Sequence, residues 1–256
     1  MKESSRTDTG KRRDHNEDSI MIDDRRDIYL LADGMGGHKA GEMASKMAVE
    51  VAYEFLAANT KEDIDNKDIP SLLAEALLKA HNAIKVSEKI DLEFKGMGTT
   101  LVIMMLRGAK AYICHVGDSR AYHISSSIKQ ITKDQTLGNH LIDTENRRPE
   151  DIPNKAWHTL IQAVGVSKKI IPASNEVELQ TGDIILLCSD GLTDMLSDAE
   201  IEEIIKDCRD NNFKETANLM VEEANRKGGK DNISVIAVQY QKAGSTFWQT
   251  LFGTLF

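Results

Sequence analysis

The stretch LLADGMGGHKAG, residues Leu30 to Gly41, contains an apolar run, an aspartate and four glycines within twelve residues. The apolar residues before Asp33 predict a buried strand, and the pattern after the glycines predicts a helix. One interpretation is a tight turn in which Asp33 is only a polar cap. The other is a loop whose backbone must come close to a charged group, because glycine has no Cβ to keep that group away.

The regions on either side of this stretch predict a mixture of strands and helices. SIMID and DIYLLAD, separated by a charged turn, predict two strands before the loop. A helix over residues 41–58 should bury a stripe at helical spacing, and a second helix should begin after Pro70. The first stripe is Met43, Met47, Val51, Phe55, Ala44, Ala48, Ala52 and Leu56, and the second is Leu73, Leu77, Ala80 and Ile84.

The second half of the chain predicts further strands, two more helices and a last strand. Four short β-type runs from Gly98 predict an antiparallel meander, and residues 133–169 predict a long polar, irregular loop that is functional or mobile. A buried strand in DIILLCSDG, two helices and a last strand in NISVIAVQY follow. We find no repeat and no linker, so residues 1–242 predict a single domain. The expected fold is α+β, a four-layer αββα sandwich of two antiparallel β-sheets flanked by helix pairs.

The composition excludes several classes of protein. The 256 residues carry a formal charge of −9, which argues against binding to nucleic acid or to anionic membranes. The three cysteines form no Cys-x-x-Cys pair, so neither a zinc site nor a disulfide framework is indicated. Neither a signal peptide nor a transmembrane segment is recognisable, and the sequence predicts a cytoplasmic protein.

Five aspartates lie where predicted strands begin or end. Asp33, Asp118 and Asp190 follow apolar runs and adjoin glycines, whereas Asp18 and Asp231 open strands. A single Asp-Gly is ordinary turn chemistry, but five such positions can meet at one rim of a sandwich. Carboxylates that converge need a counter-charge, and all-oxygen ligands favour Mg²⁺ or Mn²⁺.

A site of this kind suits the hydrolysis of a phosphate ester. Gly34 would let its carbonyl oxygen approach a cation. Two cations could activate a water between them. Arg13, a few residues before Asp18, could bind the phosphate in bidentate fashion, although it and its neighbour Arg12 could equally be a solvated charge run.

Six motifs, in order along the chain, resemble the metal-dependent type 2C (PPM) Ser/Thr protein phosphatases, in particular the compact bacterial members. The resemblance spans roughly residues 5 to 240. The motifs are RDHNEDS, LLADGMGGH, GMGTTLV, HVGDSRAY, LLCSDGLTD and GGKDNISVIAV.

The resemblance implies a role for each matching residue. Asp33 would bridge two central cations, with the Gly34 carbonyl on one of them, and a water held by both cations would attack the phosphorus. Asp190 and Asp231 would complete one metal site. The remaining implied roles are Glu17 and Asp18 at the second metal, Asp118 with Asp190 at a third, Arg13 on the substrate phosphate, and residues 133–169 as a flap.

The resemblance also implies an activity and partners. The expected enzyme hydrolyses phosphoserine and phosphothreonine in proteins with Mn²⁺ or Mg²⁺, reverses Ser/Thr kinase signalling, and acts as a monomer on phosphoproteins that include a Hanks-type Ser/Thr kinase. The alternatives are a catalytically silent family member that serves as a regulatory binding module, and a hydrolase of small phosphate esters.

Two positions depart from the family pattern. Met35 stands where many eukaryotic relatives have a histidine, so His38 becomes the candidate that protonates the leaving alkoxide. A surface role for His38 is the alternative. Gln135 replaces a histidine that is usual in relatives.

The C-terminal segment, residues 243–256, lies outside the resemblance and is rich in aromatic and apolar side chains. It could pack on its own domain, dock on a partner protein or lie at a membrane surface. The absence of basic residues beside the aromatics weakens the last alternative.

Overall fold

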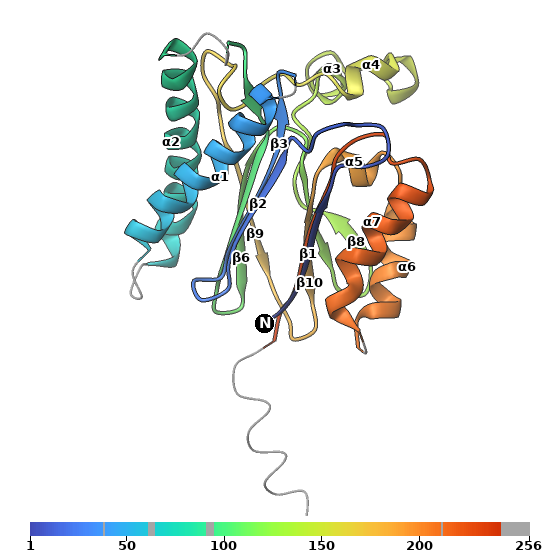
Figure 1. Ribbon diagram of the computed structural model, residues 1–256. Helices are drawn as coiled ribbons and strands as arrows, with labels where there is room; N and C mark the ends of the chain where they lie inside the picture. The colour runs from blue at the N-terminus through green and yellow to red at the C-terminus, as the bar shows by residue number, and fades with distance from the viewer. Residues whose placement is uncertain (38, 61–64, 91–94, 211, 242–256) are drawn as a thin grey trace, which may run out of the picture.

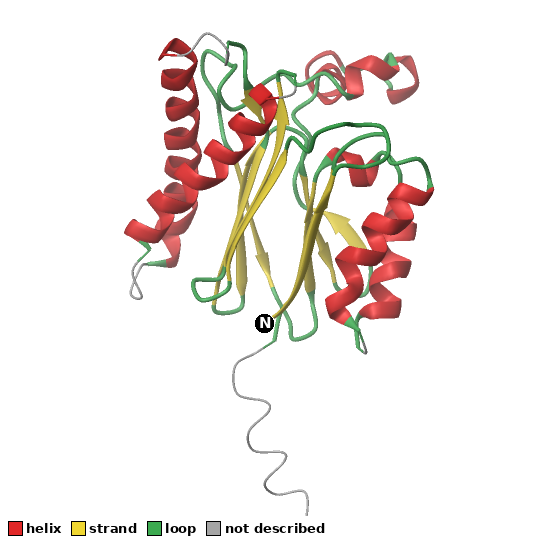
Figure 2. Cartoon of the chain, in the orientation of Figure 1, coloured by secondary structure: helices red, strands yellow, loops and turns green. Residues whose placement is uncertain are grey.

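Two antiparallel sheets stack face to face, and a pair of helices covers the outer face of each (Figures 1 and 2). The computed structural model describes residues 1–37, 39–60, 65–90, 95–210 and 212–241. The predicted α+β architecture with four αββα layers is confirmed.

The six-stranded sheet has the order β2-β3-β5-β6-β9, and β4 pairs with β3. Its strands are β2 (Asp18–Asp23), β3 (Ile28–Met35), β4 (Gly98–Thr99), β5 (Leu101–Arg107), β6 (Lys110–Val116) and β9 (Ala173–Glu178). The five-stranded sheet has the order β1-β11-β10-β7-β8. Its strands are β1 (Lys2–Asp8), β7 (Arg120–Ile124), β8 (Ile128–Gln130), β10 (Ile184–Cys188) and β11 (Ile233–Gln239).

Each sheet has its own helix pair. The helices α1 (Lys39–Asn59) and α2 (Ile69–Ile90) pack on the six-stranded sheet, and α6 (Asp198–Cys208) and α7 (Thr216–Arg226) pack on the other (Figure 1). The short elements are α3 (Leu137–Glu145), α4 (Asn154–Trp157), α5 (Asp190–Thr193), η1 (Asn66–Asp68), η3 (Pro149–Asp151) and η4 (Phe213–Glu215). Within the described residues, no helix combines the length and the apolarity that a bilayer span requires.

The strands are apolar on both faces because both faces are covered. Leu30 and Ala32 of β3 belong to the core beneath α1 and α2, whereas Tyr29 and Leu31 belong to the core between the two sheets. A strand buried on both sides has no polar face, which explains the unbroken apolar run before Asp33.

The helix predictions hold, with one change in the buried face of α1. Ala44, Ala48, Ala52 and Leu56 are buried as predicted, but the Met43 side chain is 37% exposed. The small alanines allow α1 to approach the sheet closely, and this rotates the methionine side of the helix toward solvent. All four predicted core residues of α2 are buried.

The predicted single meander from Gly98 is wrong. β5 pairs with β6 and β7 pairs with β8, but these two hairpins lie in different sheets. The chain changes sheets at Gly117–Ser119, where Gly117 has a φ of +108° that favours glycine. Asp118 therefore lies in the crossover between the two sheets.

The description of residues 133–169 as irregular is also wrong. This segment contains α3, η3 and α4, and it lies over one end of the sandwich (Figure 1). The Thr136 side chain accepts a hydrogen bond from the Asn139 N–H at the start of α3, and Asn146, with a φ of +50°, ends that helix. Helices this short leave almost no periodic signal in a sequence.

Candidate metal and phosphate site

Most of the predicted site residues line one cavity of about 520 Å³, which is also lined by His158, Thr159 and Leu160, just after α4. The predicted residues are Arg13, Glu17, Asp33, Gly34, Asp118, Asp190 and Asp231. Asp33 and Gly34 lie in β3 of the six-stranded sheet, whereas Asp190 and Asp231 adjoin β10 and β11 of the five-stranded sheet. It is therefore the stacking of the two sheets that brings these residues together. Asp18 lies behind them and is 7% exposed.

Asp33 is held firmly by its backbone. Its N–H donates to Thr100 Oγ1 at 2.9 Å, while its carbonyl accepts from Thr99 Oγ1 at 2.8 Å and from the Thr100 N–H at 2.9 Å. β3 continues two residues beyond Asp33 and pairs there with β4, so Asp33 does not end its strand as the sequence suggested. Its side chain still lines the cavity, and the hydrogen bonds fix the position of the backbone from which the side chain projects.

Hydrogen-bonded side chains connect the acidic positions of the two sheets. Thr100 Oγ1 lies 2.7 Å from Ser119 Oγ, next to Asp118. Ser189, the residue before Asp190, donates from Oγ to Asp18 Oδ2 at 2.8 Å. Thr100 and Ser119 belong to motifs noted in the sequence, but hydroxyl side chains that act through neighbours carry no pattern that would have singled them out.

Two buried carboxylate oxygens have no hydrogen-bond partner within the described part of the chain. They are Asp18 Oδ1 and Asp190 Oδ1. A buried oxygen without a donor is costly, so its presence needs a ligand to explain it. The donor set contains only oxygens, which fits a hard divalent cation of the Mg²⁺ or Mn²⁺ type.

The carboxylates titrate abnormally. Burial, assisted by neighbouring carboxylates, raises the pKa of Asp18 and of Asp190 to about 7 and that of Asp118 to about 6. The same causes raise the pKa of Asp33 well above its usual value. Arg13 is the one arginine or lysine among the described residues that line the cavity. A divalent cation would supply the missing positive charge.

Arg13 lies at the rim of the cavity and reaches Asp231. Its Nη2 is 2.6 Å from Asp231 Oδ2, and its side chain is 48% exposed. Arg12 is not among the residues that line the cavity. Of the two neighbouring arginines, the geometry favours Arg13 for contact with a phosphate.

Asn232 was missed by the sequence reasoning. Its Oδ1 accepts from the Glu17 N–H at 2.8 Å, and its Nδ2 donates to the carbonyls of Thr9 and His15 at 2.9 and 2.8 Å. It thereby ties the loop before β2 to β11. Asn232 directly follows Asp231, but an asparagine before a strand gives no signal of such a role.

Two glycines make room for Glu17. A Cβ on Gly34 would lie 2.5 Å from the Glu17 carbonyl oxygen, and a Cβ on Gly41 would collide with the Glu17 carboxylate. Gly41 is in the first turn of α1, so the carboxylate lies against a helix N-terminus. The glycines thus serve a close approach, as the second interpretation of the opening stretch required.

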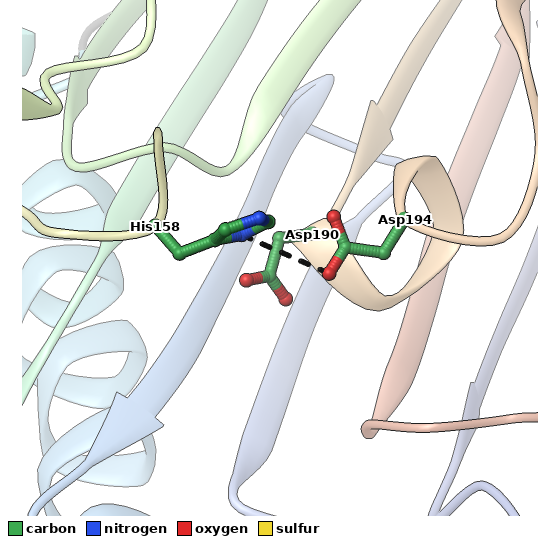
Figure 3. Close-up of side chains that lie close together, drawn as sticks. All are labelled: His158, Asp190 and Asp194. Carbon is green, nitrogen blue, oxygen red and sulfur yellow. Dashed lines mark ion pairs between the residues drawn. The ribbon is translucent and has the colours of Figure 1, made fainter. Parts of the chain in front are cut away.

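The histidines differ from the expectation. His38 lies outside the described residues. His158, which follows α4, does line the cavity, and its Nδ1 is 3.9 Å from Asp194 Oδ2 (Figure 3). One ligand atom from each of His158, Asp190 and Asp194 lies within 4.8 Å of the others. A single histidine in a polar segment carries no sequence signal that would reveal this.

Gln135 contacts the crossover between the sheets. Its Oε1 accepts from the Gly117 N–H at 2.9 Å, and its own N–H donates to the Gly117 carbonyl at 3.0 Å. The start of the segment over the cavity is therefore attached to the residue that precedes Asp118.

Comparisons with known proteins agree with this geometry. The family model for protein phosphatase 2C matches residues 8–232. A serine/threonine phosphatase of Listeria innocua is 37% identical over 239 residues, which is 91% of this chain and 94% of the relative. The solved structure of a serine/threonine phosphatase from Staphylococcus aureus is similar with a TM-score of 0.83 and 30% identity, over 93% of this chain and 94% of that one.

A second solved structure is informative about metals. The catalytic domain of the serine/threonine protein phosphatase PstP, in complex with two manganese ions, matches with a TM-score of 0.79 and 33% identity over 93% of this chain and 97% of that one. The chain described here belongs to the protein phosphatase 2C family. Within that family it is a protein serine/threonine phosphatase of the bacterial type.

Proposed function

We propose that the acidic cavity binds two divalent cations, Mn²⁺ or Mg²⁺, and hydrolyses phosphoserine and phosphothreonine in proteins. When bound, such a pair supplies the charge that activates a water and stabilises the transferring phosphoryl group. The observation that carries this proposal is the set of carboxylates on one rim, with the buried oxygens of Asp18 and Asp190 unpartnered.

The residues of the site would have separate roles in binding the cations, binding the phosphate and transferring a proton. Asp33 would contact both cations, with the Gly34 carbonyl, Glu17 and Asp18 on one side. Asp190 and Asp231 would lie on the other side, and Asp118 with Asp190 would form a third, weaker site. The half-exposed guanidinium of Arg13 would bind and orient the substrate phosphate. His38 stays the candidate for protonating the leaving alkoxide.

The decisive experiment compares the parent protein with Asp190→Asn. Release of phosphate from a phosphothreonine peptide should require Mn²⁺ or Mg²⁺ and stop with EDTA. In Asp190→Asn, turnover should fall about a hundredfold or more, because a ligand of the charge-stabilising centre is lost. Calorimetric titration with Mn²⁺ should show weaker binding in the same variant.

Asp207→Asn is the matched control, because Asp207 is exposed on α6, which covers the outer face of the five-stranded sheet. It should keep both activity and metal affinity. A parent protein that binds Mn²⁺ but hydrolyses no phosphopeptide would contradict the proposal and favour the regulatory binding module.

The proposed substrates are phosphoproteins, among them a Hanks-type Ser/Thr kinase. This last identity rests on the sequence resemblance alone. Phosphorylated kinase should lose phosphate on incubation with the enzyme and Mn²⁺. The monomeric state and the cytoplasmic location stay predictions.

A further inference from the structure

The loop of residues 161–171, which leads from the cavity to β9, exposes apolar and basic side chains. Ile161, Val166 and Ile171 are 48%, 50% and 69% exposed. Lys168 and Lys169 are also exposed. Single apolar residues on a surface are common, but three exposed apolar and two exposed basic side chains within the eleven residues 161–171 are not.

The loop is fixed by hydrogen bonds that point inward. The Gln162 side chain accepts from the Ile171 N–H at 2.8 Å and donates to the Ile171 carbonyl at 3.0 Å. The Gly165 N–H donates to Nδ1 of the buried His81 at 3.0 Å, and Lys85 Nζ donates to the Ser167 carbonyl at 3.1 Å. The exposed side chains therefore stand on a backbone that is already ordered, which lowers the entropic cost of binding.

The loop adjoins the cavity at two points, through Leu160, which precedes the loop, and through Val166 within it. Leu160, just before the loop, lines the cavity. Val166 packs so closely on Gly98 that a Cβ there would collide with its Cγ2. Gly98 pairs with Met35, which also lines the cavity. A polypeptide whose phosphorylated residue enters the cavity can therefore pass over this loop.

The charge of the loop contrasts with the rest of the molecule. The chain has a net charge of −9, yet residues 161–171 contain two lysines and no acidic residue. Neither Lys168 nor Lys169 forms an ion pair with another described residue. By contrast, Arg147 and Arg148, between α3 and η3, are paired with Glu145 and Asp151.

We propose that residues 161–171 form a docking surface for the substrate polypeptide. This surface selects substrates that carry acidic residues or a second phosphate, together with an apolar side chain, near the residue to be dephosphorylated. The inference rests on the proposed function and specifies its substrate class. Lys168 and Lys169 would contact the acidic groups, and Val166 and Ile171 would contact the apolar side chain.

The test compares phosphothreonine peptides of equal length: neutral, with acidic residues before the phosphothreonine, or with acidic residues after it. At low salt, kcat/KM for at least one acidic peptide should exceed that for the neutral peptide by about three- to tenfold, as expected for two exposed ion pairs. The advantage should shrink as salt is raised. In Lys168→Glu/Lys169→Glu it should vanish or reverse, while p-nitrophenyl phosphate is hydrolysed at the parent rate.

The control variant Lys129→Glu/Lys214→Glu makes the same charge change on β8 and η4, and it should keep the preference. A parent enzyme that does not distinguish the peptides, or a preference that survives charge reversal in the loop, would overturn the proposal. Ile171→Ser should raise KM only for peptides with an apolar neighbour.

Failure of the phosphatase itself would be seen separately, as absence of turnover on every substrate including p-nitrophenyl phosphate. In that case fluorescence anisotropy with labelled peptides in EDTA still decides the matter. The acidic peptide should bind the parent three- to tenfold more tightly than the neutral peptide, and equal affinities would refute the docking surface.

Discussion

Asp18 on β2 and Asp33 on β3 are directly opposite each other in the antiparallel ladder. Like charges in this position destabilise a sheet, and here both are withdrawn from bulk water. The adjoining Asp190 adds to the repulsion, since it raises the pKa of both. The fold therefore carries an electrostatic cost at the point where the proposed cations would bind.

Replacing one of this pair should stabilise the metal-free protein. In EDTA at neutral pH, Asp33→Asn should raise the free energy of unfolding by about 1 kcal/mol or more, because a buried charge and its repulsion are removed. Mn²⁺ should stabilise the parent strongly and the variant weakly. Urea unfolding with and without Mn²⁺ measures both effects, and a metal-free variant that is less stable than the parent would argue against stored repulsion.

The stability of the metal-free protein should depend on pH in a defined direction. Asp18 and Asp190 have a pKa of about 7 in the folded protein, against about 3.8 when unfolded. Between these values the folded state binds more protons than the unfolded state, so the free energy of unfolding falls as the pH rises from about 4 to 7. Each such group contributes at most about 1.4 kcal/mol per pH unit.

Asp190→Asn removes the contribution of Asp190 and also lowers the pKa of Asp18 and Asp33, because their repulsion with Asp190 is lost. Both effects act in the same direction. In EDTA the variant's stability should decline less steeply over the same pH range. An equal or steeper decline would show that Asp190 is ionised throughout.

Gly41→Ala should damage the site even though alanine favours helices. Alanine would ordinarily stabilise α1 by up to about 1 kcal/mol. Its Cβ would collide with the Glu17 carboxylate, so that side chain must move. We expect weaker Mn²⁺ binding and a loss of about 1–3 kcal/mol in stability.

A double-mutant cycle with Glu17→Ala tests the cause. Once the carboxylate is removed, Gly41→Ala should be tolerated or mildly stabilising. If the penalty were the same in both backgrounds, the collision with Glu17 would not be its source.

Arg13→Ala should impair phosphate binding, and its neighbour supplies the control. Because Arg13 lines the cavity and Arg12 does not, only Arg13→Ala should raise KM for a phosphopeptide, by about tenfold for the loss of a charge-assisted contact. Arg12→Ala should behave as the parent. Steady-state kinetics on both variants decide between a phosphate ligand and a solvated charge run.

The sequence alone determined the layers and the chemistry of the site. Period-two and helical patterns are set by the backbone, so the apolar run before Asp33, the face of α2 and the last strand could be recognised directly. Aspartates beside glycines at predicted strand boundaries pointed to a cation site, because residue type restricts which ligands can be held. The strands β1 and β9 were not predicted, because their sequences are largely polar.

Tertiary structure decided which of these residues meet. The stacking of the two sheets places Asp118, in the crossover at Gly117, in the same cavity as Asp33 from β3. Asn232 belongs to the site because it contacts Glu17, about 215 residues earlier in the chain. His158 belongs to it because it contacts Asp194, about 36 residues later. Such contacts depend on how the layers pack and not on local propensity. A single sequence contains much information about local propensity and little about the packing of layers.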